Sequence, residues 1–343
     1  MNHLRCCSRC VLSGKRVTSL FYTAGNGRWI ARWMGPAIRE LVKRQQRAGP
    51  QPESLRRHYL EWNEDAELYA FNSRLSERFE PGLLARAFTF NSYLVREARE
   101  QQKVGIESPI FESQDNSDLI EHGKKTGRRI VTAYLGAALP RAPQECIDAL
   151  LDYLLSPAVV AKAASLIGTK DLILTAESPI SEDTLSCTFF ALVGALEQSP
   201  NVNSIHVVKF IRDFLIACLH EKEITAIWRP REPENVLDDI LLRENLEEAE
   251  PRLIGQAGVH SLLAVYRVAF YSNQQFLGSG YGETIEEAKE AAAVDSLNRM
   301  FGLADFCKPI PYDLVMDANS EVETKNLPLA RWCSENVNRL MNR

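Results

Sequence analysis

The sequence lacks several features that would place it in a special class of protein. No run of about 18 uncharged apolar residues occurs in its 343 residues, so no membrane span is expected. No second CxxC pair accompanies Cys7 and Cys10, and most other cysteines stand singly among apolar residues. This dispersal argues against a disulfide framework and against a zinc site. With 45% hydrophobic and 25% charged residues, the composition is that of an ordinary globular protein rather than a disordered one.

Acidic residues are absent from the first 39 positions, which hold seven Lys and Arg residues among Ser, Thr and small residues. This composition is typical of an organelle transit peptide. We therefore expect residues 1–35 to direct the chain to the mitochondrial matrix. A basic arm on a cytosolic protein would have the same composition, and the sequence does not show a cleavage point.

Charge is distributed unevenly along the chain. Residues 1–60 hold 12 Lys and Arg residues and two acids, whereas the rest of the chain holds 28 basic and 43 acidic residues. Two different roles are therefore expected in one chain. Residues 36–60 form a basic arm, interrupted by Pro and Gly at 49–52. Because phosphate contacts dominate affinity for RNA, its basic residues are candidate RNA contacts: Arg39, Lys43, Arg44, Arg47, Arg56 and Arg57.

The segment from Asn63 to Trp228 shows helical periodicity and no strand-like alternation. A helix is expected to start at Asn63, and a polar loop from Ser108 should enter another helix that continues to about Leu139. Further helices are expected at 83–94, 142–155, 157–167, 184–197 and 205–228.

The pattern changes after a linker at Pro230–Pro233. A helix is expected at 236–248, strands at 251–253, 261–271 and 274–278, and a helix at 285–301. The order α-β-β-β-α, after an all-helical block, predicts an α+β protein with two domains, at 61–229 and 232–303. Residues 304–343 are expected to form a C-terminal tail with short helices.

The second block resembles a double-stranded-RNA-binding domain. The resemblance lies in Gly278-Ser279-Gly280-Tyr281-Gly282 and the Ala-rich helix that follows. In that helix Ala288, Ala292 and Ser296 recur every four residues, so their small side chains would let the helix lie close to the sheet.

The helical block resembles a ribonuclease III domain. The resemblance lies in the segments 87–93 and 191–195, together with Asn116, Leu119 and Gly123. Taken as a whole, residues 55–303 resemble the ribonuclease III-like proteins of the mitochondrial large ribosomal subunit, most specifically at 210–216 and 280–284.

Ribonuclease III enzymes bind Mg²⁺ through two pairs of carboxylates, because this ion prefers oxygen ligands. The resemblance places the first pair at Ile120 and Lys124 and the second at Cys187 and Phe190. None of these side chains is a suitable ligand, and no neighbouring register supplies a set of acids. We therefore expect no catalytic residues, no metal and no cofactor. Ile120, Cys187 and Phe190 are expected to be packing residues, and Lys124 is either a solvated surface charge or a phosphate contact.

The double-stranded-RNA-binding family uses a Lys-rich run at the start of its last helix. Here that run holds Glu286 and Glu287, and only Lys289 matches. His260 lies near the family's loop histidine but lacks the preceding Gly-Pro, which favours an ordinary loop residue. Duplex binding by this domain is therefore expected to be weak, with Lys289 as its remaining RNA contact.

The resemblance implies a structural constituent of the mitochondrial large ribosomal subunit that supports mitochondrial translation. Its partners would be mitochondrial rRNA, other large-subunit proteins and, as in nucleases of this fold, a ribonuclease III-like dimer partner. Two alternatives remain open. One is a matrix RNA-binding factor in transcript maturation or ribosome assembly. The other, disfavoured by the missing carboxylates, is a ribonuclease III-type endonuclease.

Overall fold

The computed structural model describes residues 34–49, 61–105, 114–200, 202–261, 263–303, 310–312, 314 and 326–334. The chain forms two units, Met1–Leu55 and Arg56–Arg343. The described part of the first unit is one helix, α2 (Met34–Ala48), followed by Gly49 at φ +80°. A glycine in this left-handed conformation is a common helix terminator. The expected basic arm therefore contains a helix, which ends where the Pro/Gly interruption begins.

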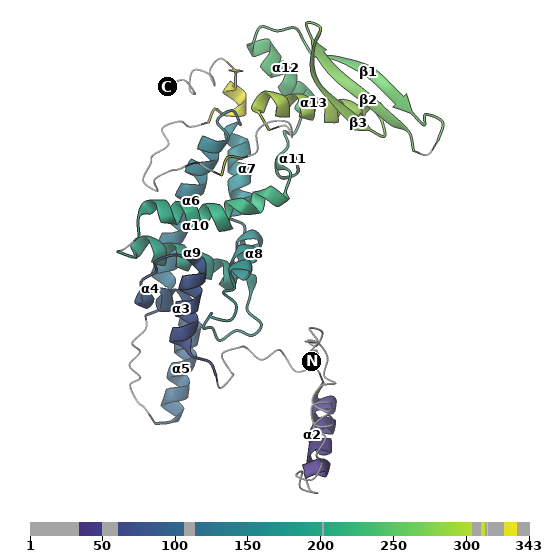
Figure 1. The fold of residues 1–343 in the computed structure, drawn as a ribbon. Helices are drawn as coiled ribbons and strands as arrows, with labels where there is room; N and C mark the ends of the chain where they lie inside the picture. Colours follow the sequence, from purple (N-terminus) through teal and green to yellow (C-terminus); the bar gives the residue numbers. More distant parts are fainter. Residues whose placement is uncertain are drawn as a thin grey trace, which may run out of the picture. The chain divides into compact units, whose positions relative to one another are not determined.

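The second unit opens with a helical region (Figure 1). Its elements are α3 (Glu64–Leu75), α4 (Pro81–Phe88), α5 (Asn91–Lys103), α6 (Ser117–Ala138), α7 (Gln144–Leu154), α8 (Pro157–Ile167), α9 (Glu182–Gln198), α10 (Ser204–Phe214), the 3₁₀ helix η2 (Ile216–Glu221) and α11 (Ile224–Ile227). No described helix is by itself long and apolar enough to cross a membrane, although the bent pair α7 and α8 meets those criteria together.

Helix ends follow local sequence signals. The Asn63 side chain accepts a hydrogen bond from Ala66 N at 3.3 Å, and Ser181 Oγ accepts one from Thr184 N at 3.2 Å. These side chains satisfy amide groups that have no partner within the helix. Pro157 occupies the first turn of α8, where its missing N–H costs nothing. These signals explain why the predicted helices at 157–167 and 184–197 agree closely with α8 and α9.

The single helix predicted over 83–94 is wrong, because the chain leaves helical geometry between α4 and α5. Thr89 forms an isolated parallel bridge with Leu174. Phe90 N donates to Leu174 O at 3.1 Å, and Leu174 N donates to Phe88 O at 2.9 Å. The partner strand comes from a distant part of the sequence, so no local periodicity could reveal the break.

The helix predicted over 205–228 is also interrupted. After α10 the chain tightens into η2, where Cys218 N donates to Leu215 O at 3.1 Å. Leu215 and Ile216 are neighbours and both are fully buried. Neighbouring residues on a regular helix point about 100° apart. The chain changes from an α-helix to a 3₁₀ helix at the point where Leu215 and Ile216 are both buried against the core.

Helix α9 forms the centre of the core. Between Thr184 and Leu196 every residue except Cys187 is buried. A helix that is apolar on all sides must be surrounded by other elements. Aromatic rings pack around it: Phe189 stacks on Phe210 with ring centroids 5.6 Å apart, and Phe79 meets Phe210 edge-on at 6.3 Å.

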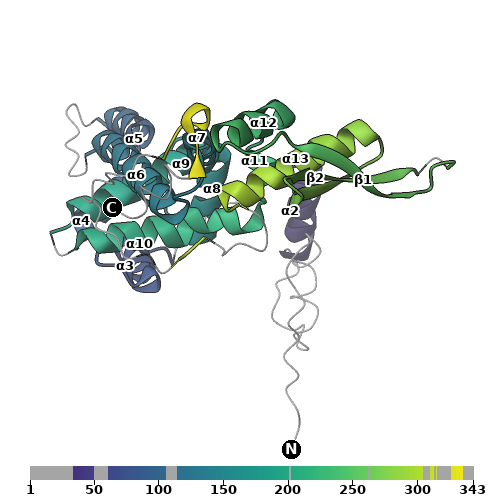
Figure 2. The ribbon, with the colours of Figure 1, turned by 90° about the horizontal axis from the view of Figure 1, so that it is seen from above.

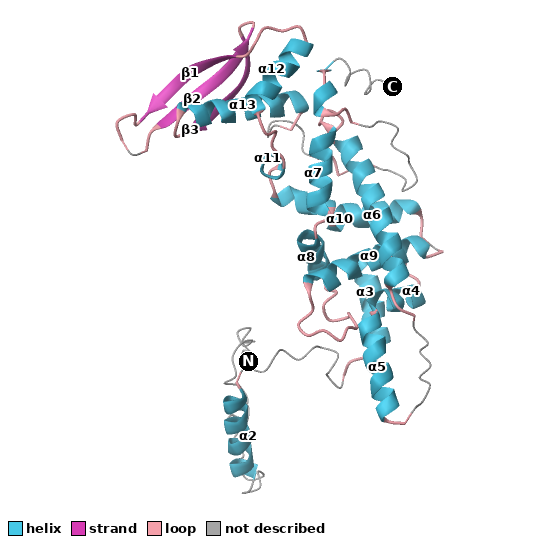
Figure 3. Ribbon diagram, turned by 180° about the vertical axis from the view of Figure 1, so that it is seen from behind, coloured by secondary structure: helices cyan, strands magenta, loops and turns pink. Residues whose placement is uncertain are grey.

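The sheet region confirms the predicted α-β-β-β-α order and the α+β class. Its elements are α12 (Pro233–Arg243), β1 (Glu250–Ala257), β2 (Val265–Ser272), β3 (Gln275–Gly282) and α13 (Ile285–Phe301). The strands form one antiparallel sheet in the order β1-β2-β3 (Figure 3). The third strand was predicted to end at Gly278, but it continues to Gly282. Its glycines are strand residues rather than a loop.

Helix α13 lies along the sheet (Figure 2). A Cβ atom at Gly278 would lie 2.6 Å from Ser296 N, and one at Gly282 would lie 2.5 Å from Ala288 N. A Cβ atom at Gly280 would clash with the backbone of Ala292. The predicted close approach of the small residues of α13 to the sheet is confirmed.

Described residues of the tail join the helical region to the sheet region. Trp332 is 1% exposed and meets Phe301 of α13 edge-on, with ring centroids 4.9 Å apart. Its indole Nε1 donates to Arg141 O, beside α7, at 2.8 Å, and Arg243 of α12 donates to Leu329 O at 2.9 Å. Residues 326–334 therefore bind both regions at once.

The contact between β3 and α13 predicts the effect of one substitution. Gly280→Val should lower the free energy of unfolding by about 3 kcal/mol, because the added side chain meets backbone atoms that cannot move aside. Urea denaturation measures this change. Gly82→Ala on α4 is the control, since no atom lies within 4 Å of its added Cβ, and it should not destabilise the protein. Equal urea midpoints for Gly280→Val and the wild type would contradict the prediction.

Candidate functional site

The four positions expected to hold metal ligands lie on α6 and α9, as the resemblance implied. Ile120 is half-buried and Lys124 is exposed on α6, whereas Cys187 is half-buried and Phe190 is buried on α9. The structure therefore brings the two helices together but places an apolar, a cationic, a thiol and an aromatic side chain at these positions.

The two helices cross at glycines. A Cβ atom at Gly123 of α6 would clash with the Phe190 carbonyl, and one at Gly194 of α9 would clash with the Leu119 carbonyl. Gly127 faces the Phe190 ring, whose nearest carbon would lie 3.3 Å from an added Cβ. Phe190 thus packs against a bare stretch of α6 backbone, which explains why it is only 5% exposed.

The residues at these positions do not fit Mg²⁺. An alkyl or aromatic side chain offers no ligand atom, a thiolate is too soft, and Lys124 adds positive charge. The nearest acids are already paired. Glu121 accepts a hydrogen bond from Lys125 at 2.7 Å, which holds the pKa of Glu121 below its ordinary value, and Asp118 pairs with Arg86 at 2.9 Å. Among the described residues, no group of three His, Cys, Asp or Glu side chains gathers at any point.

The motif residues that the chain does retain have packing roles. Asn116 is 1% exposed and donates to Ala87 O at 3.0 Å, which ties the start of α6 to α4. Leu119 is fully buried, and Gly123 allows the close contact with α9. The chain therefore keeps the motif residues that pack α6 against α4 and α9, and it lacks the motif residues that would bind a metal ion.

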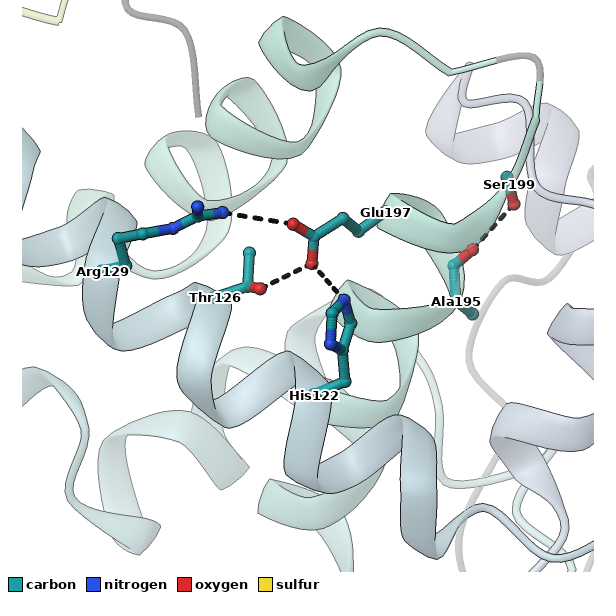
Figure 4. A network of polar contacts seen from close by, with 6 residues as sticks. All are labelled: His122, Thr126, Arg129, Ala195, Glu197 and Ser199. Carbon is teal, nitrogen blue, oxygen red and sulfur yellow. Dashed lines mark hydrogen bonds and ion pairs between the residues drawn. The ribbon is translucent and has the colours of Figure 1, made fainter. Parts of the chain in front are cut away.

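A carboxylate that the sequence reasoning did not identify links α6 and α9 beyond these positions (Figure 4). Glu197 accepts from Thr126 Oγ1 at 2.5 Å and pairs with His122 at 2.8 Å and Arg129 at 3.2 Å. A carboxylate near a helix C-terminus is disfavoured by the helix dipole, and three polar partners offset this. The signal in the sequence is the spacing of His122, Thr126 and Arg129, which places them on one face of α6.

Cys146 of α7 is not suited to act as a nucleophile. Burial raises the pKa of the Cys146 thiol to about 12, so this thiol stays protonated at neutral pH and is a poor nucleophile.

Four of the six candidate RNA contacts of the arm lie together on α2. Arg39, Lys43 and Arg47 are exposed and spaced by four, so they form one basic stripe. Arg44 is also exposed and pairs with Glu40 at 3.6 Å. Ile38, Leu41 and Val42 form the opposite, apolar side of the helix. Arg56 and Arg57, like nearly all of the expected transit peptide, lie outside the described residues.

The start of α13 carries a capping side chain and two acidic residues in its first turn. Thr284 Oγ1 accepts from Glu287 N at 3.2 Å, and the Glu287 carboxylate accepts from Glu283 N at 3.1 Å. A helix N-terminus binds phosphate through free amides, but here Thr284 occupies the Glu287 amide, and exposed Glu286 and Glu287 place negative charge beside the first turn. Lys289 is half-buried one turn further, and His260 is exposed in the loop between β1 and β2.

Comparison with known proteins assigns both regions. Residues 63–196 match the family model described as large ribosomal subunit protein mL44, endonuclease domain, and residues 228–333 match the MRPL44 dsRNA-binding domain. The chain belongs to the mL44 family. The second match extends through the docked residues 326–333, which the resemblance in the sequence did not cover.

The large ribosomal subunit protein mL44 of Caenorhabditis elegans is 29% identical to this mL44 family member over 276 residues. The aligned part covers 79% of this chain and 68% of the relative. A solved structure of Dicer from Pichia stipitis covers 56% of this chain and 96% of its own, with 15% identity and a TM-score of 0.33, too low to support an inference.

The packing of Phe190 predicts that a carboxylate cannot simply be added at its position in this protein. Phe190→Glu should lower the free energy of unfolding by about 3 kcal/mol or more, because it removes a core ring and buries a charge without a partner. Thermal unfolding followed by circular dichroism measures this loss.

Lys124→Asp is the matched control, because this position is exposed on α6. Substitutions at such surface positions usually change stability by about 0.5 kcal/mol or less. A Phe190→Glu protein as stable as the control would show that a carboxylate can be accommodated between α6 and α9.

Proposed function

We propose that this chain is a structural constituent of the mitochondrial large ribosomal subunit, where it binds rRNA and neighbouring ribosomal proteins and supports mitochondrial translation. Two observations support the proposal. The chain belongs to a family whose model is described as a large ribosomal subunit protein. Its ribonuclease III-like helix pair keeps the packing residues Asn116, Leu119 and Gly123 but has no carboxylate at the ligand positions.

The decisive observation for a non-enzymatic role is the contact between α6 and α9. Phe190 fills the space against Gly127, so restoring ligands would require the helix pair to repack. A ribonuclease III-type reaction depends on carboxylates that hold metal ions beside the phosphodiester. The proposed role is therefore binding and scaffolding rather than cleavage.

The proposed division of the chain follows the charge and the folded elements. Residues 1–35 act as a mitochondrial transit peptide, and 36–60 form the basic arm. Residues 61–229 form the inactive ribonuclease III-like domain, 232–303 the double-stranded-RNA-binding-like domain, and 304–343 the tail. The protein then acts in the mitochondrial matrix as part of the ribosome.

RNA binding is assigned mainly to the arm. The stripe of Arg39, Lys43 and Arg47 offers three exposed cations on one helix, and Arg44, Arg56 and Arg57 add to it. At the start of α13, by contrast, Glu286 and Glu287 repel phosphate, so Lys289 contributes little. The acidic and apolar surfaces of the second unit are proposed to contact ribosomal proteins, including a ribonuclease III-like partner.

Sucrose-gradient sedimentation of mitochondrial lysate tests the proposed function. The endogenous protein should sediment with the large ribosomal subunit and remain there after a wash in moderate salt, because a constituent is held by many contacts. Sedimentation in light fractions only would favour the alternative, a matrix RNA-binding factor in transcript maturation or ribosome assembly.

The assignment of RNA binding to the arm predicts a salt-dependent effect. Substituting Arg39, Lys43 and Arg47 by Gln should weaken binding to an rRNA fragment and lower the slope of log K against log salt by about 2–3, since each phosphate contact contributes about 0.7–0.9. Filter binding across a salt series measures both values.

A matched control removes three exposed charges elsewhere, with Lys103, Arg128 and Lys170 changed to Gln. Its slope should stay close to that of the wild type, and Lys289→Glu should also have a small effect. If Lys289→Glu abolished binding while the arm variant bound normally, the sheet region would be the main RNA contact.

A further inference from the structure

The two faces of the three-stranded sheet differ in what covers them. Helix α13 packs on the face that carries Gly278, Gly280 and Gly282. The strand register places a different set of side chains on the opposite face. Tyr281 of β3 lies opposite Arg267 of β2, and Ser279 of β3 lies opposite Ala269 of β2. On the neighbouring strand β1, Arg252 also lies opposite Ala269. We call the set Arg252, Arg267, Tyr271, Phe276 and Tyr281 the outer sheet face.

Arginine and aromatic side chains are stacked on the outer sheet face. The Arg252 guanidinium lies 5.2 Å from the centre of the Tyr271 ring, and that of Arg267 lies 5.2 Å from the Tyr281 ring. Tyr271 and Phe276 meet edge-on at 5.8 Å. Ala269, at the centre of this face, is fully buried, so the larger side chains around it cover the middle of the sheet.

Packing against α13 does not explain why position 281 is a tyrosine. Its neighbours Gly280 and Gly282 are required by the close helix, but Tyr281 itself points the other way and is 60% exposed. Phe276, near the end of the sheet, is 45% exposed, and its ring also lies 5.2 Å from the Arg299 guanidinium of α13. Large aromatic groups left open to solvent on one face indicate an interaction site more than a core position.

Charge on this face favours a nucleic-acid ligand. Arg267 makes no ion pair with any described residue, and its only hydrogen bond there is a 3.5 Å contact with Ser279 Oγ. Arg252 pairs with Glu250, at one end of the strand, at 2.8 Å. A cation without a carboxylate partner, stacked on an open ring, can contact a phosphate while the ring stacks on a base.

We propose that the outer sheet face binds unpaired RNA nucleotides, with Tyr281 stacking on a base and Arg267 contacting the adjoining phosphate. This inference rests on the proposed function, since it adds a second kind of RNA contact to the basic arm. Duplex RNA hides its bases inside the helix, whereas single strands expose them to aromatic side chains. The face therefore selects unpaired segments.

Fluorescence anisotropy of the full chain with a labelled single-stranded RNA 12-mer, and with the same 12-mer as a duplex, tests the proposal. Tyr281→Ala should weaken single-strand binding about tenfold, within the range that base–aromatic stacking supplies, and leave duplex binding unchanged. The salt slope should be unaffected by Tyr281→Ala and should decrease for Arg267→Gln. Tyr281→Phe retains the ring and should bind like the wild type.

Tyr69→Ala on α3 is the matched control, because Tyr69 is 75% exposed and distant in sequence from the sheet. Thermal unfolding of each variant shows whether the fold is intact. Unchanged single-strand affinity in a folded Tyr281→Ala protein would overturn the proposal, and so would an equal loss for single strand and duplex.

The outcome separates this proposal from the proposed function. If Tyr281→Ala binds RNA normally but the arm variant does not, the arm assignment stands and the outer sheet face is not an RNA site. If Tyr281→Ala binds RNA normally but releases the chain from the large subunit in a gradient, the face docks protein instead and the proposal is wrong.

Discussion

Two helix backbones meet without intervening side chains where α6 crosses α9 at Gly123 and Gly194. A single Cβ atom at either position would overlap a carbonyl of the other helix. This approach lets α9 be buried almost completely and determines which positions of α6 it faces. The core aromatics around Phe189 and Phe210 and the Glu197 network all depend on the same crossing.

The same physical device occurs in the sheet region. Glycines in β3 meet the small residues of α13, so strand and helix approach to a distance that any larger side chain would prevent. In both regions, glycines and other small residues that permit close backbone contact are among the residues that resemble an RNA-processing family. The chemistry of that family depends on other positions, which here hold Ile120, Lys124, Cys187 and Phe190. A fold can therefore be kept by a chain that has no carboxylates at the expected ligand positions, because packing and ligation use different residues.

Docking of the tail adds a constraint that neither region has alone. Trp332 lies between Arg141 and Phe301, and Arg243 donates to the backbone of the same segment. A buried Trp whose indole N–H has a hydrogen-bond partner contributes both buried apolar surface and a directional hydrogen bond to such a contact. The sheet region is therefore held on the helical region through residues outside both predicted domains. In the proposed role, the outer sheet face would be presented from a fixed scaffold.

Short-range patterns in the sequence determined much of this protein. Helical patterning and the prolines and glycines between segments predicted α8, α9 and α13, and the spacing of Ala288, Ala292 and Ser296 predicted the close contact with the sheet. The charge distribution predicted the basic arm, and the resemblance supplied the positions expected to hold metal ligands. Only the tertiary structure decided the breaks at Thr89 and Leu215, the partners of Glu197, the docking of Trp332 and the side of the sheet to which Tyr281 points. Except for the break at Leu215, which coincides with burial, each of these depends on a residue distant in sequence, and burial and hydrogen bonding with such a partner outweigh local preference.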